Sequence, residues 1–330
     1  MSLTLAGALN AALDDALAAD EKVVLIGEDI GTLGGVFRVT DGLQATYGRS
    51  RVIDSPLAES AIIGTAVGMA YRGMRPVCEI QFDGFVYPGF DQLVTQVARL
   101  HYRTRGAVRM PLTVRIPYGG GIGAVEHHSE SPEAYFAHTA GLRVVTAASP
   151  QEAYSTMRAA IASDDPVVFL EPKRRYWTKG EVDRSVRADL STARVVAPGR
   201  DVTLVAYGPM VATALDAAIA ASDEGISVEV IDLRAISPLD RDTVAASVRR
   251  TGRLVVVHEA QASCSVSTEV ITAVVEECFA HLEAAPERVT GYDTPYPPAG
   301  LEDTFLPDLD RILDAVDHTL GRRNSLGAAS

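Results

Sequence analysis

The chain has 330 residues, of which 47% are hydrophobic and 22% are charged, a balance typical of a folded globular protein. Lys and Arg number 30 against 43 Asp and Glu, so the net charge is −13, which disfavours nucleic acid as a partner because phosphate binding needs clustered positive charge. No apolar run approaches the roughly 20 residues that span a bilayer, which disfavours a membrane protein. The three cysteines, Cys78, Cys264 and Cys278, lack metal or disulfide spacing, so we expect buried thiols in a reducing cytoplasm.

The first half of the chain alternates predicted helices and short apolar strands. Residues 1–20 mix Leu and Ala with three aspartates and predict an amphipathic helix rather than a signal or transit peptide. The predicted strands are 22–26, 76–82, 112–116, 142–146 and 167–170, and the predicted helices are 57–71, 90–102 and 151–162. Ser149, Pro150 and Glu152 form a capping box that predicts the start of the last helix. Such strands, separated by helices, indicate a parallel sheet covered on both faces.

The alternation of predicted strands and helices stops at residues 171–199, where basic residues cluster at 173–175 and polar residues follow. We therefore interpret this stretch as a connection between two domains. The pattern then restarts with predicted strands at 202–207, 227–233, 253–258 and 288–292, and predicted helices at 211–222, 241–250, 266–279 and 308–318. We therefore expect an α/β protein with two doubly wound, mostly parallel-sheet domains at 1–185 and 201–330, joined by a linker at 186–200. Fold class alone does not assign a function.

Glu59 lies in the segment DSPLAES, where Ser55 as cap and Pro56 at the first position predict a helix start. A glutamate in the first turn can simply complement the helix dipole, which is worth roughly 0.3–1 kcal/mol. The helix continues as the apolar run AIIGTAVGMA at 61–70, so we expect this end to be buried. A buried carboxylate needs a partner, and because the nearby sequence offers no cation, a functional role is the alternative.

Two further segments carry side chains suited to chemistry. His127 and His128 follow a glycine-rich loop; as neighbours they make a poor metal pair, so they are either incidental loop residues or one imidazole acts as a proton donor or acceptor. Gln81 to Phe85 (QFDGF) follow a predicted parallel strand, where ligands bind in open α/β sheets, although aromatic residues there can also belong to the core. No GxGxxG, GxxxxGK[ST], GxSxG or CxxC motif is present, which weakens nucleotide-binding, hydrolase and thiol-redox functions.

At these residues the sequence resembles the β subunits of the decarboxylating component of 2-oxo-acid dehydrogenase complexes, from about residue 3 to 320. The matching segments include GED at 27–29, GGVFRVTDGL at 34–43, DSPLAES at 54–60, RPVCEIQFDGF at 75–85, HHSESPEAYFAH at 127–138, DPVVFLEPKRRY at 165–176, VEVIDLRAISPLD at 228–240, TGRLVVVHEA at 251–260 and GYDTPYPP at 291–298. The resemblance implies a pyrimidine-binding thiamine-enzyme domain, then a transketolase C-terminal-like domain, in a chain active only with α subunits as α2β2. In that family the α chain holds the diphosphate and Mg²⁺ through a GDG motif, which this sequence lacks, as a β chain would.

The resemblance also implies roles for three residues, Glu59, Phe85 and His128. Glu59 matches the glutamate that hydrogen-bonds the aminopyrimidine of thiamine diphosphate and thereby activates the cofactor. Phe85 matches an aromatic residue that packs on the pyrimidine ring, and we include Gln81 among the cofactor-binding residues. His128 matches a histidine that assists transfer of the acyl group to a lipoyl arm.

A structural K⁺ or Na⁺ is also implied, held by backbone carbonyls that match Leu112, Ala160 and Asp165. Two departures from the family pattern stand out. Glu130 replaces a common Gln and should raise the pKa of His128 if the two side chains are close. Residues 262–268 (ASCSVST) replace a glycine-rich stretch, which puts the local backbone in doubt.

The segments HHSESPEAYFAH and FLEPKRRY look closer to the branched-chain members. The resemblance therefore implies a 2-oxoisovalerate dehydrogenase that passes the acyl group to the lipoyl acyltransferase core, with pyruvate as the second substrate. One methylene discriminates by only about 1–3 kcal/mol, so mixed specificity is compatible with this assignment. The alternatives are a self-sufficient thiamine enzyme, which the missing GDG disfavours, and a non-catalytic scaffold that docks a basic acyltransferase domain through its acidic surface.

Overall fold

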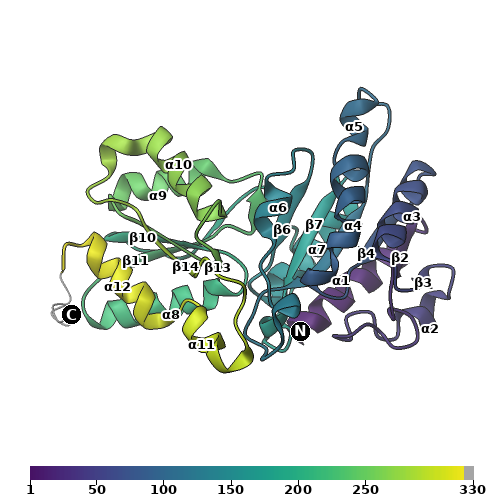
Figure 1. Cartoon of the computed structure of the whole chain (residues 1–330), viewed down its shortest axis with the longest axis horizontal. Coiled ribbons are helices and arrows are strands. Elements are labelled where there is room, and N and C mark those ends of the chain that lie inside the picture. Colours follow the sequence, from purple (N-terminus) through teal and green to yellow (C-terminus); the bar gives the residue numbers. More distant parts are fainter. Residues whose placement is uncertain (323–330) are drawn as a thin grey trace. The chain divides into compact units, whose positions relative to one another are not determined.

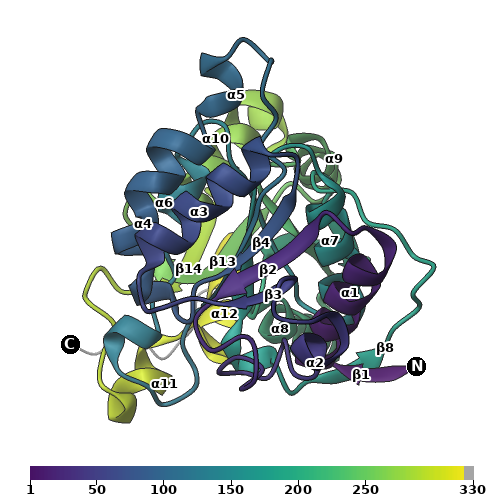
Figure 2. The same cartoon turned by 90° about the vertical axis from the view of Figure 1, so that its right-hand side faces the viewer.

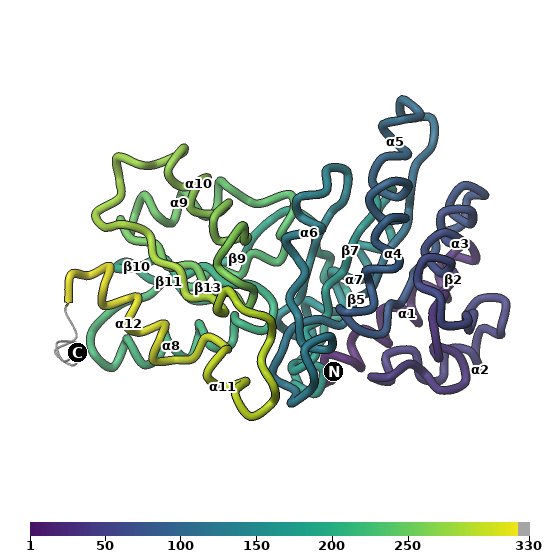
Figure 3. Tube along the Cα trace, viewed as in Figure 1, coloured from purple at the N-terminus to yellow at the C-terminus, as the bar shows by residue number. Residues whose placement is uncertain are grey.

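The computed structural model describes residues 1–322, so residues 323–330 of the second predicted domain lie outside the described part. The chain separates into two compact units, one of residues 1–190 with Ile236–Pro238 and one of Ser191–Ala235 with the chain from Leu239 onward (Figure 1). Each unit is built on its own mostly parallel sheet, and Figure 3 traces the chain through both. The predicted α/β fold class is confirmed.

The first unit contains a seven-stranded sheet in the order β12-β6-β7-β5-β4-β2-β3. Its strands are β2 (Val23–Gly27), β3 (Val52–Asp54), β4 (Arg75–Glu79), β5 (Thr113–Tyr118), β6 (Arg143–Thr146), β7 (Val167–Pro172) and β12 (Ala235–Ser237). The pairs from β6 to β3 are parallel, and β2, β5 and β7 are buried along their whole length. Strands buried on both faces need apolar side chains at successive positions, which explains the continuous Val, Ile and Leu runs.

The helices of the first unit cover both faces of this sheet. They are α1 (Leu5–Ala19), α2 (Leu43–Tyr47), α3 (Glu59–Tyr71), α4 (Tyr87–Gln92), a π-helical turn (Leu93–Val97), α5 (Leu100–Arg103), α6 (Glu133–Ala137) and α7 (Pro150–Ala162). Figure 2 shows α3 with α4 on one side of β2 and β4, and α1 with α7 on the other. As predicted, the Ser149 side chain caps α7 by accepting from the Glu152 N–H at 3.3 Å.

Two helix predictions need correction. The helix predicted at 57–71 begins at Glu59, and Ser55 does not cap it, because its hydroxyl donates to the Pro56 carbonyl at 2.9 Å. The helix predicted at 90–102 is interrupted, because its middle forms a π-helical turn and α5 begins only at Leu100. A π-turn carries an extra residue, so the α-helical register cannot continue through it.

The segment predicted as a connection, 171–199, contains two short strands. Strand β8 (Lys179–Glu181) pairs antiparallel with β1 (Ser2–Thr4), and β9 (Arg194–Ala197) pairs antiparallel with β11 (Val228–Asp232). Strand β9 lies within residues 186–200, where we expected the linker. Both strands are short and lack an alternating pattern, so only their pairing partners reveal them.

The second unit contains a five-stranded sheet in the order β14-β13-β10-β11-β9. The remaining strands are β10 (Val202–Ala206), β11 (Val228–Asp232), β13 (Leu254–Gln261) and β14 (Glu287–Gly291), and the helices are α8 (Met210–Asp223), α9 (Arg241–Thr251), α10 (Val266–Cys278), α11 (Glu302–Phe305) and α12 (Leu309–Thr319). Figure 1 shows α9 with α10 on one face of this sheet and α8 with α12 on the other.

Within residues 1–322 no helix is both long and apolar enough to cross a bilayer. The three cysteines are free, and Cys78 and Cys278 are buried as expected. Cys264 is exposed instead, because it occupies a left-handed turn, with φ of 53°, just before α10.

Candidate functional site

Glu59 is the first residue of α3 and is 8% exposed. Its position is fixed by close packing of α3 on α4, because a Cβ atom at Gly89 would lie only 3.2 Å from the Glu59 carbonyl oxygen. Among the described residues, the Glu59 carboxylate has no hydrogen-bond or ion-pair partner. The residue is largely buried, but its carboxylate oxygens are reached by solvent, so this side chain is placed to receive a ligand that carries a donor.

Glu28 lies near Glu59, and Gln81 lies beside Glu28, just after the carboxyl ends of the neighbouring strands β4 and β2. Gln81 follows β4, and its amide donates to the Glu28 carbonyl at 3.5 Å and to the Asp29 carboxylate at 3.3 Å. The pKa of the Glu28 carboxyl group is raised by burial, then by the negative charges of Asp29 and Glu59. The carboxyl edge of the parallel sheet therefore carries clustered acids and an amide, as the position of Gln81 after a strand predicts.

Aromatic rings surround His128 in the same unit. The His128 ring stacks on Phe82, with ring centroids 4.0 Å apart, and meets Phe85 edge-on at 5.1 Å. Gly84 lies against this loop, because a Cβ atom there would come 2.2 Å from the His127 carbonyl oxygen. The structure thus brings Phe85 and His128 together, although their positions are 43 residues apart in the sequence.

The His128 Nδ1 atom lies 3.0 Å from the His127 carbonyl oxygen. A carbonyl can only accept, so Nδ1 carries a hydrogen and Nε2 holds the lone pair of the neutral ring. The Glu130 carboxylate accepts from the Tyr87 hydroxyl at 2.8 Å. The Glu130 carboxylate is therefore paired with a tyrosine. Burial, together with this hydrogen bond, raises the pKa of the Tyr87 hydroxyl.

The first unit contains two groups of buried ion pairs, one around Arg115 and one between Asp83 and Lys173. Neither was predicted from the sequence. Arg115 donates to Glu79 at 2.6 Å and to Glu171 at 2.6 and 3.0 Å, and all three side chains are buried. Asp83 and Lys173 form a second ion pair, with burial raising the pKa of Asp83 to about 6 against the lowering effect of Lys173. The only sequence signal was a charged residue inside or beside an apolar strand.

Comparison with known proteins decides the family. The transketolase pyrimidine-binding domain matches residues 1–178, and the transketolase C-terminal domain matches residues 191–312. A pyruvate dehydrogenase E1 component subunit beta from Leifsonia xyli subsp. xyli is 58% identical over 320 residues, covering 97% of this chain and 95% of that one. A 3-methyl-2-oxobutanoate dehydrogenase subunit beta from Mycobacterium tuberculosis is 55% identical over 321 residues, covering 97% and 92%.

The chain belongs to the β subunits of the thiamine-dependent 2-oxo-acid dehydrogenases. A 2-oxoisovalerate dehydrogenase subunit beta from Pseudomonas aeruginosa is also similar, at 48% identity over 316 residues, covering 90% of this chain and 89% of that one. A split-gene transketolase solved as an inactive tetramer shares the fold, with a TM-score of 0.79 and 21% identity, covering 98% of this chain and 99% of that one. The resemblance stated from sequence is thus confirmed at the level of the family.

The three carbonyls expected to hold a monovalent cation already accept hydrogen bonds. The Leu112 carbonyl accepts from Val167 at 2.9 Å, while Ala160 and Asp165 both accept from Ser163, at 3.1 and 3.0 Å. Each carbonyl keeps a second lone pair, so the donor set remains compatible with a cation. The Arg75 guanidinium also donates to this turn, reaching Ser163 at 2.9 Å. The 160–165 turn therefore holds a cationic side chain whether or not a metal ion binds.

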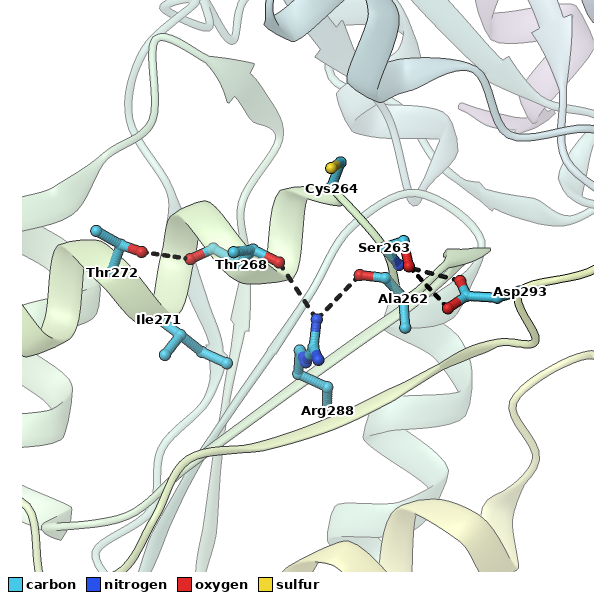
Figure 4. Close-up of a pocket in the computed structure, with 8 residues that line it drawn as sticks. All are labelled: Ala262, Ser263, Cys264, Thr268, Ile271, Thr272, Arg288 and Asp293. Atoms are coloured by element: carbon cyan, nitrogen blue, oxygen red, sulfur yellow. Dashed lines mark hydrogen bonds between the residues drawn. The ribbon is translucent and has the colours of Figure 1, made fainter.

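The unusual segment 262–268 of the second unit forms a turn at 262–265 and then the first residues of α10. The Ser263 hydroxyl donates to Asp293 at 2.8 Å, and Arg288 donates to the Ala262 carbonyl at 2.9 Å (Figure 4). A cavity of about 430 Å³ adjoins this turn, lined by Ala262, Ser263, Cys264, Thr268, Ile271, Thr272, Arg288 and Asp293. Side-chain hydrogen bonds thus hold this turn in place.

Proposed function

We propose that the chain, paired with an α subunit in an α2β2 assembly, catalyses the oxidative decarboxylation of a 2-oxo acid. The observation that carries this proposal is Glu59, a largely buried residue whose carboxylate reaches solvent and has no partner among the described residues, near the carboxyl edge of the sheet. Membership in the family of thiamine-dependent β subunits supports the same function. We assign the diphosphate and Mg²⁺ of thiamine diphosphate to the α subunit.

The chain's own residues would bind and orient the pyrimidine part of the cofactor. Bound thiamine diphosphate supplies the electron sink for the loss of CO2. Glu59 would exchange a proton with a ring nitrogen placed against its carboxylate, since no internal donor competes for that group. Phe85 would supply an apolar ring surface, and Gln81 an amide near Glu28.

The decisive test is Glu59→Gln in the complete α2β2 enzyme with thiamine diphosphate and Mg²⁺. Decarboxylation measured with an artificial electron acceptor should fall by about a hundredfold or more, as expected for loss of a general acid–base group. The matched control is Glu21→Gln, which removes an exposed carboxylate from the same unit and should leave the rate unchanged. A normal rate for Glu59→Gln contradicts the proposal, as does full activity of this chain without an α subunit.

We further propose that His128 assists transfer of the acyl group to a lipoyl arm. Because Nδ1 donates to the His127 carbonyl, Nε2 is the ring atom that remains to carry a proton to or from a sulfur atom of the lipoyl group. His128→Gln should slow acyl transfer to a lipoyl domain by about a hundredfold while the artificial-acceptor reaction stays near normal. Equal loss in both reactions would contradict a role limited to transfer.

For the substrate, we propose the branched-chain 2-oxo acids, as in a 2-oxoisovalerate dehydrogenase. The segments that resemble branched-chain members and the relatives from M. tuberculosis and P. aeruginosa support this proposal. Pyruvate is the second candidate, because the L. xyli relative, at 58% identity, is a pyruvate dehydrogenase subunit. The ratio of kcat/KM for 2-oxoisovalerate and pyruvate decides between them, and a ratio below one favours pyruvate.

We also propose that the acidic second unit docks a basic domain of the lipoyl acyltransferase core. Residues 191–330 carry 21 Asp and Glu against 11 Lys and Arg, and this acidic balance supports an electrostatic contribution to such binding. Binding between the second unit and the basic domain should weaken markedly as salt rises from about 50 to about 500 mM, because salt in this range screens exposed charges. Association that is insensitive to salt counts against this docking, and binding without catalysis would favour the non-catalytic scaffold.

The carbonyls of Leu112, Ala160 and Asp165 are our proposed ligands for a monovalent cation, K⁺ first. Bound K⁺ stabilises only the folded state, so melting temperature should rise with KCl and not with an equal concentration of tetramethylammonium chloride. Equal melting temperatures in the two salts contradict the site.

A further inference from the structure

Asp83 and Lys173 form a buried ion pair next to the loop that carries His128. Asp83 is fully buried at the start of a 3₁₀ turn (Asp83–Phe85) that follows β4. Lys173 is 2% exposed and follows β7, and its ammonium group donates to one Asp83 carboxylate oxygen. The pair therefore joins the carboxyl ends of two strands of the same sheet.

The second Asp83 carboxylate oxygen directly contacts the loop of residues 119–131 that carries His128, here called the histidine loop. It accepts the backbone N–H of Glu130 at 2.7 Å, two residues after His128. The Glu130 carbonyl in turn accepts the Gly119 N–H at 2.8 Å, where β5 ends. The carboxyl-terminal side of the histidine loop is thus fixed on Asp83 and on the sheet.

Lys173 reaches the same loop through an aromatic ring. Its ammonium group lies 5.6 Å from the centroid of the Phe82 ring, and that ring stacks on His128 at 4.0 Å. Phe82 is also the residue before Asp83, so the backbone that carries the ring is held by the same ion pair. Asp83 and Lys173 therefore both help to fix the position of the His128 imidazole.

Such a pair is not needed for stability alone. A buried ion pair can often be replaced by apolar residues of similar volume with little loss of stability, because removing two charges from water is costly. What an apolar replacement cannot supply is an oxygen that accepts the Glu130 N–H. The geometry separates a stabilising role from a positioning role, and the two make different predictions.

We propose that Asp83 and Lys173 are positioning residues that fix the orientation of the His128 imidazole for acyl transfer. This inference rests on the proposed function, in which His128 serves the transfer half-reaction and Glu59 serves decarboxylation. Asp83 acts through its hydrogen bond to Glu130, and Lys173 acts by holding Asp83 and the Phe82 ring. Neither residue touches the reacting atoms.

Two double variants in the α2β2 enzyme differ in whether the side chain at position 83 carries an amide, and hence an acceptor oxygen. D83N/K173M removes both charges and keeps an amide oxygen for the Glu130 N–H, whereas D83L/K173M has nearly the same shape and no acceptor. We expect D83L/K173M to slow acyl transfer to a lipoyl domain about tenfold or more relative to D83N/K173M, since small misplacements cost large factors in rate. The artificial-acceptor rates of the two variants should agree within about twofold, because Glu59 is untouched.

Hydrogen exchange of residues 119–131 gives a readout that does not depend on activity. The Glu130 amide should exchange faster in D83L/K173M than in D83N/K173M, while amides of β4 remain protected in both. Equal acyl-transfer rates, or parallel losses in both half-reactions, would show a purely structural pair and overturn the proposal.

Should D83L/K173M fail to fold, the unaltered enzyme carries the test. Its Glu130 amide must then exchange about tenfold more slowly than the amides of the exposed residues 32–33, and fast exchange overturns the proposal. If the unaltered enzyme shows no acyl transfer at all, the proposed function is wrong, and exchange at Glu130 alone decides whether Asp83 holds the loop.

Discussion

The ring of Phe82 lies nearly parallel to the imidazole of His128, with the ring planes inclined by 20° and the centroids 4.0 Å apart. Stacking of this kind restrains the imidazole in both rotation and translation, beyond the area that it buries. The two residues are brought together by neighbouring loops at the carboxyl end of the sheet, so the contact depends on the fold of the whole first unit.

Phe82→Leu removes this stack and should slow acyl transfer to a lipoyl domain about tenfold, because the imidazole is no longer held in one orientation. Decarboxylation with an artificial acceptor should change by less than about threefold. The matched control is Phe37→Leu, since Phe37 packs on Phe82 and Tyr176 from the same aromatic cluster. If both variants lose transfer equally, the stack on His128 has no specific role.

Gly84→Ala should lower the free energy of unfolding by about 1–3 kcal/mol, measured by urea denaturation of the chain. The reason is the His127 carbonyl oxygen, which lies 2.2 Å from the position of the new Cβ atom and is backbone that cannot rotate away. Gly68→Ala is the control, because its Cβ would meet no atom within 4 Å and should stabilise helix α3 slightly. Equal stability of the two variants would contradict the packing described for Gly84.

Arg115→Met should cost about 3–5 kcal/mol of unfolding free energy, because it leaves the buried carboxylates of Glu79 and Glu171 without their cation. Arg143→Met on the adjacent part of the sheet is the comparison. Its partner Asp165 is half exposed, so that loss should stay below about 1 kcal/mol. Urea denaturation of both variants at neutral pH gives the difference, and a loss below about 1 kcal/mol for Arg115→Met would refute a cooperative buried network.

His258 should make the second unit less stable in mild acid. Burial lowers the pKa of its imidazole to about 4 from the ordinary value of 6.5, and its Nε2 atom lies 2.9 Å from the Ser267 hydroxyl. Between these two pKa values the unfolded chain binds a proton that the folded chain does not. Stability is therefore full above pH 6.5 and falls as pH drops toward 4, by about 3 kcal/mol in total.

Native-state hydrogen exchange of β13 amides between pH 7.5 and 4.5 measures this loss, after correction for the intrinsic pH dependence of exchange. His258→Gln should flatten the profile, whereas replacing the exposed His281 with Gln should leave it unchanged. An identical profile in all three proteins would assign the acid sensitivity to other groups.

Much of the fold follows from local sequence patterns. Long apolar strands such as β2, β5 and β10 were predicted to within two residues, because burial on both faces demands consecutive apolar side chains. Strands β1, β3, β8, β9 and β12 were missed, because each has only three or four residues and exists through pairing with another segment. The π-helical turn at 93–97 was missed because its residues are ordinary helix formers.

The candidate site divides in the same way. The sequence placed Glu59 correctly at a helix start, while the strand predicted at 76–82 ends at Glu79 and so leaves Gln81 just beyond it. The family resemblance supplied the roles of Glu59, Phe85 and His128. The roles of all three remain predictions. The Asp83–Lys173 pair could not be found from sequence, because its members lie 90 residues apart and neither forms a motif.

Strand β12 has a consequence for any attempt to divide the protein. It belongs to the edge of the first sheet, beside β6, although it follows β11 of the second unit in the chain. A gene fragment that stops at residue 190 would encode a sheet whose β6 edge is open, and open edges recruit other chains into aggregates. Such a fragment should be insoluble unless residues 236–238 are supplied with it.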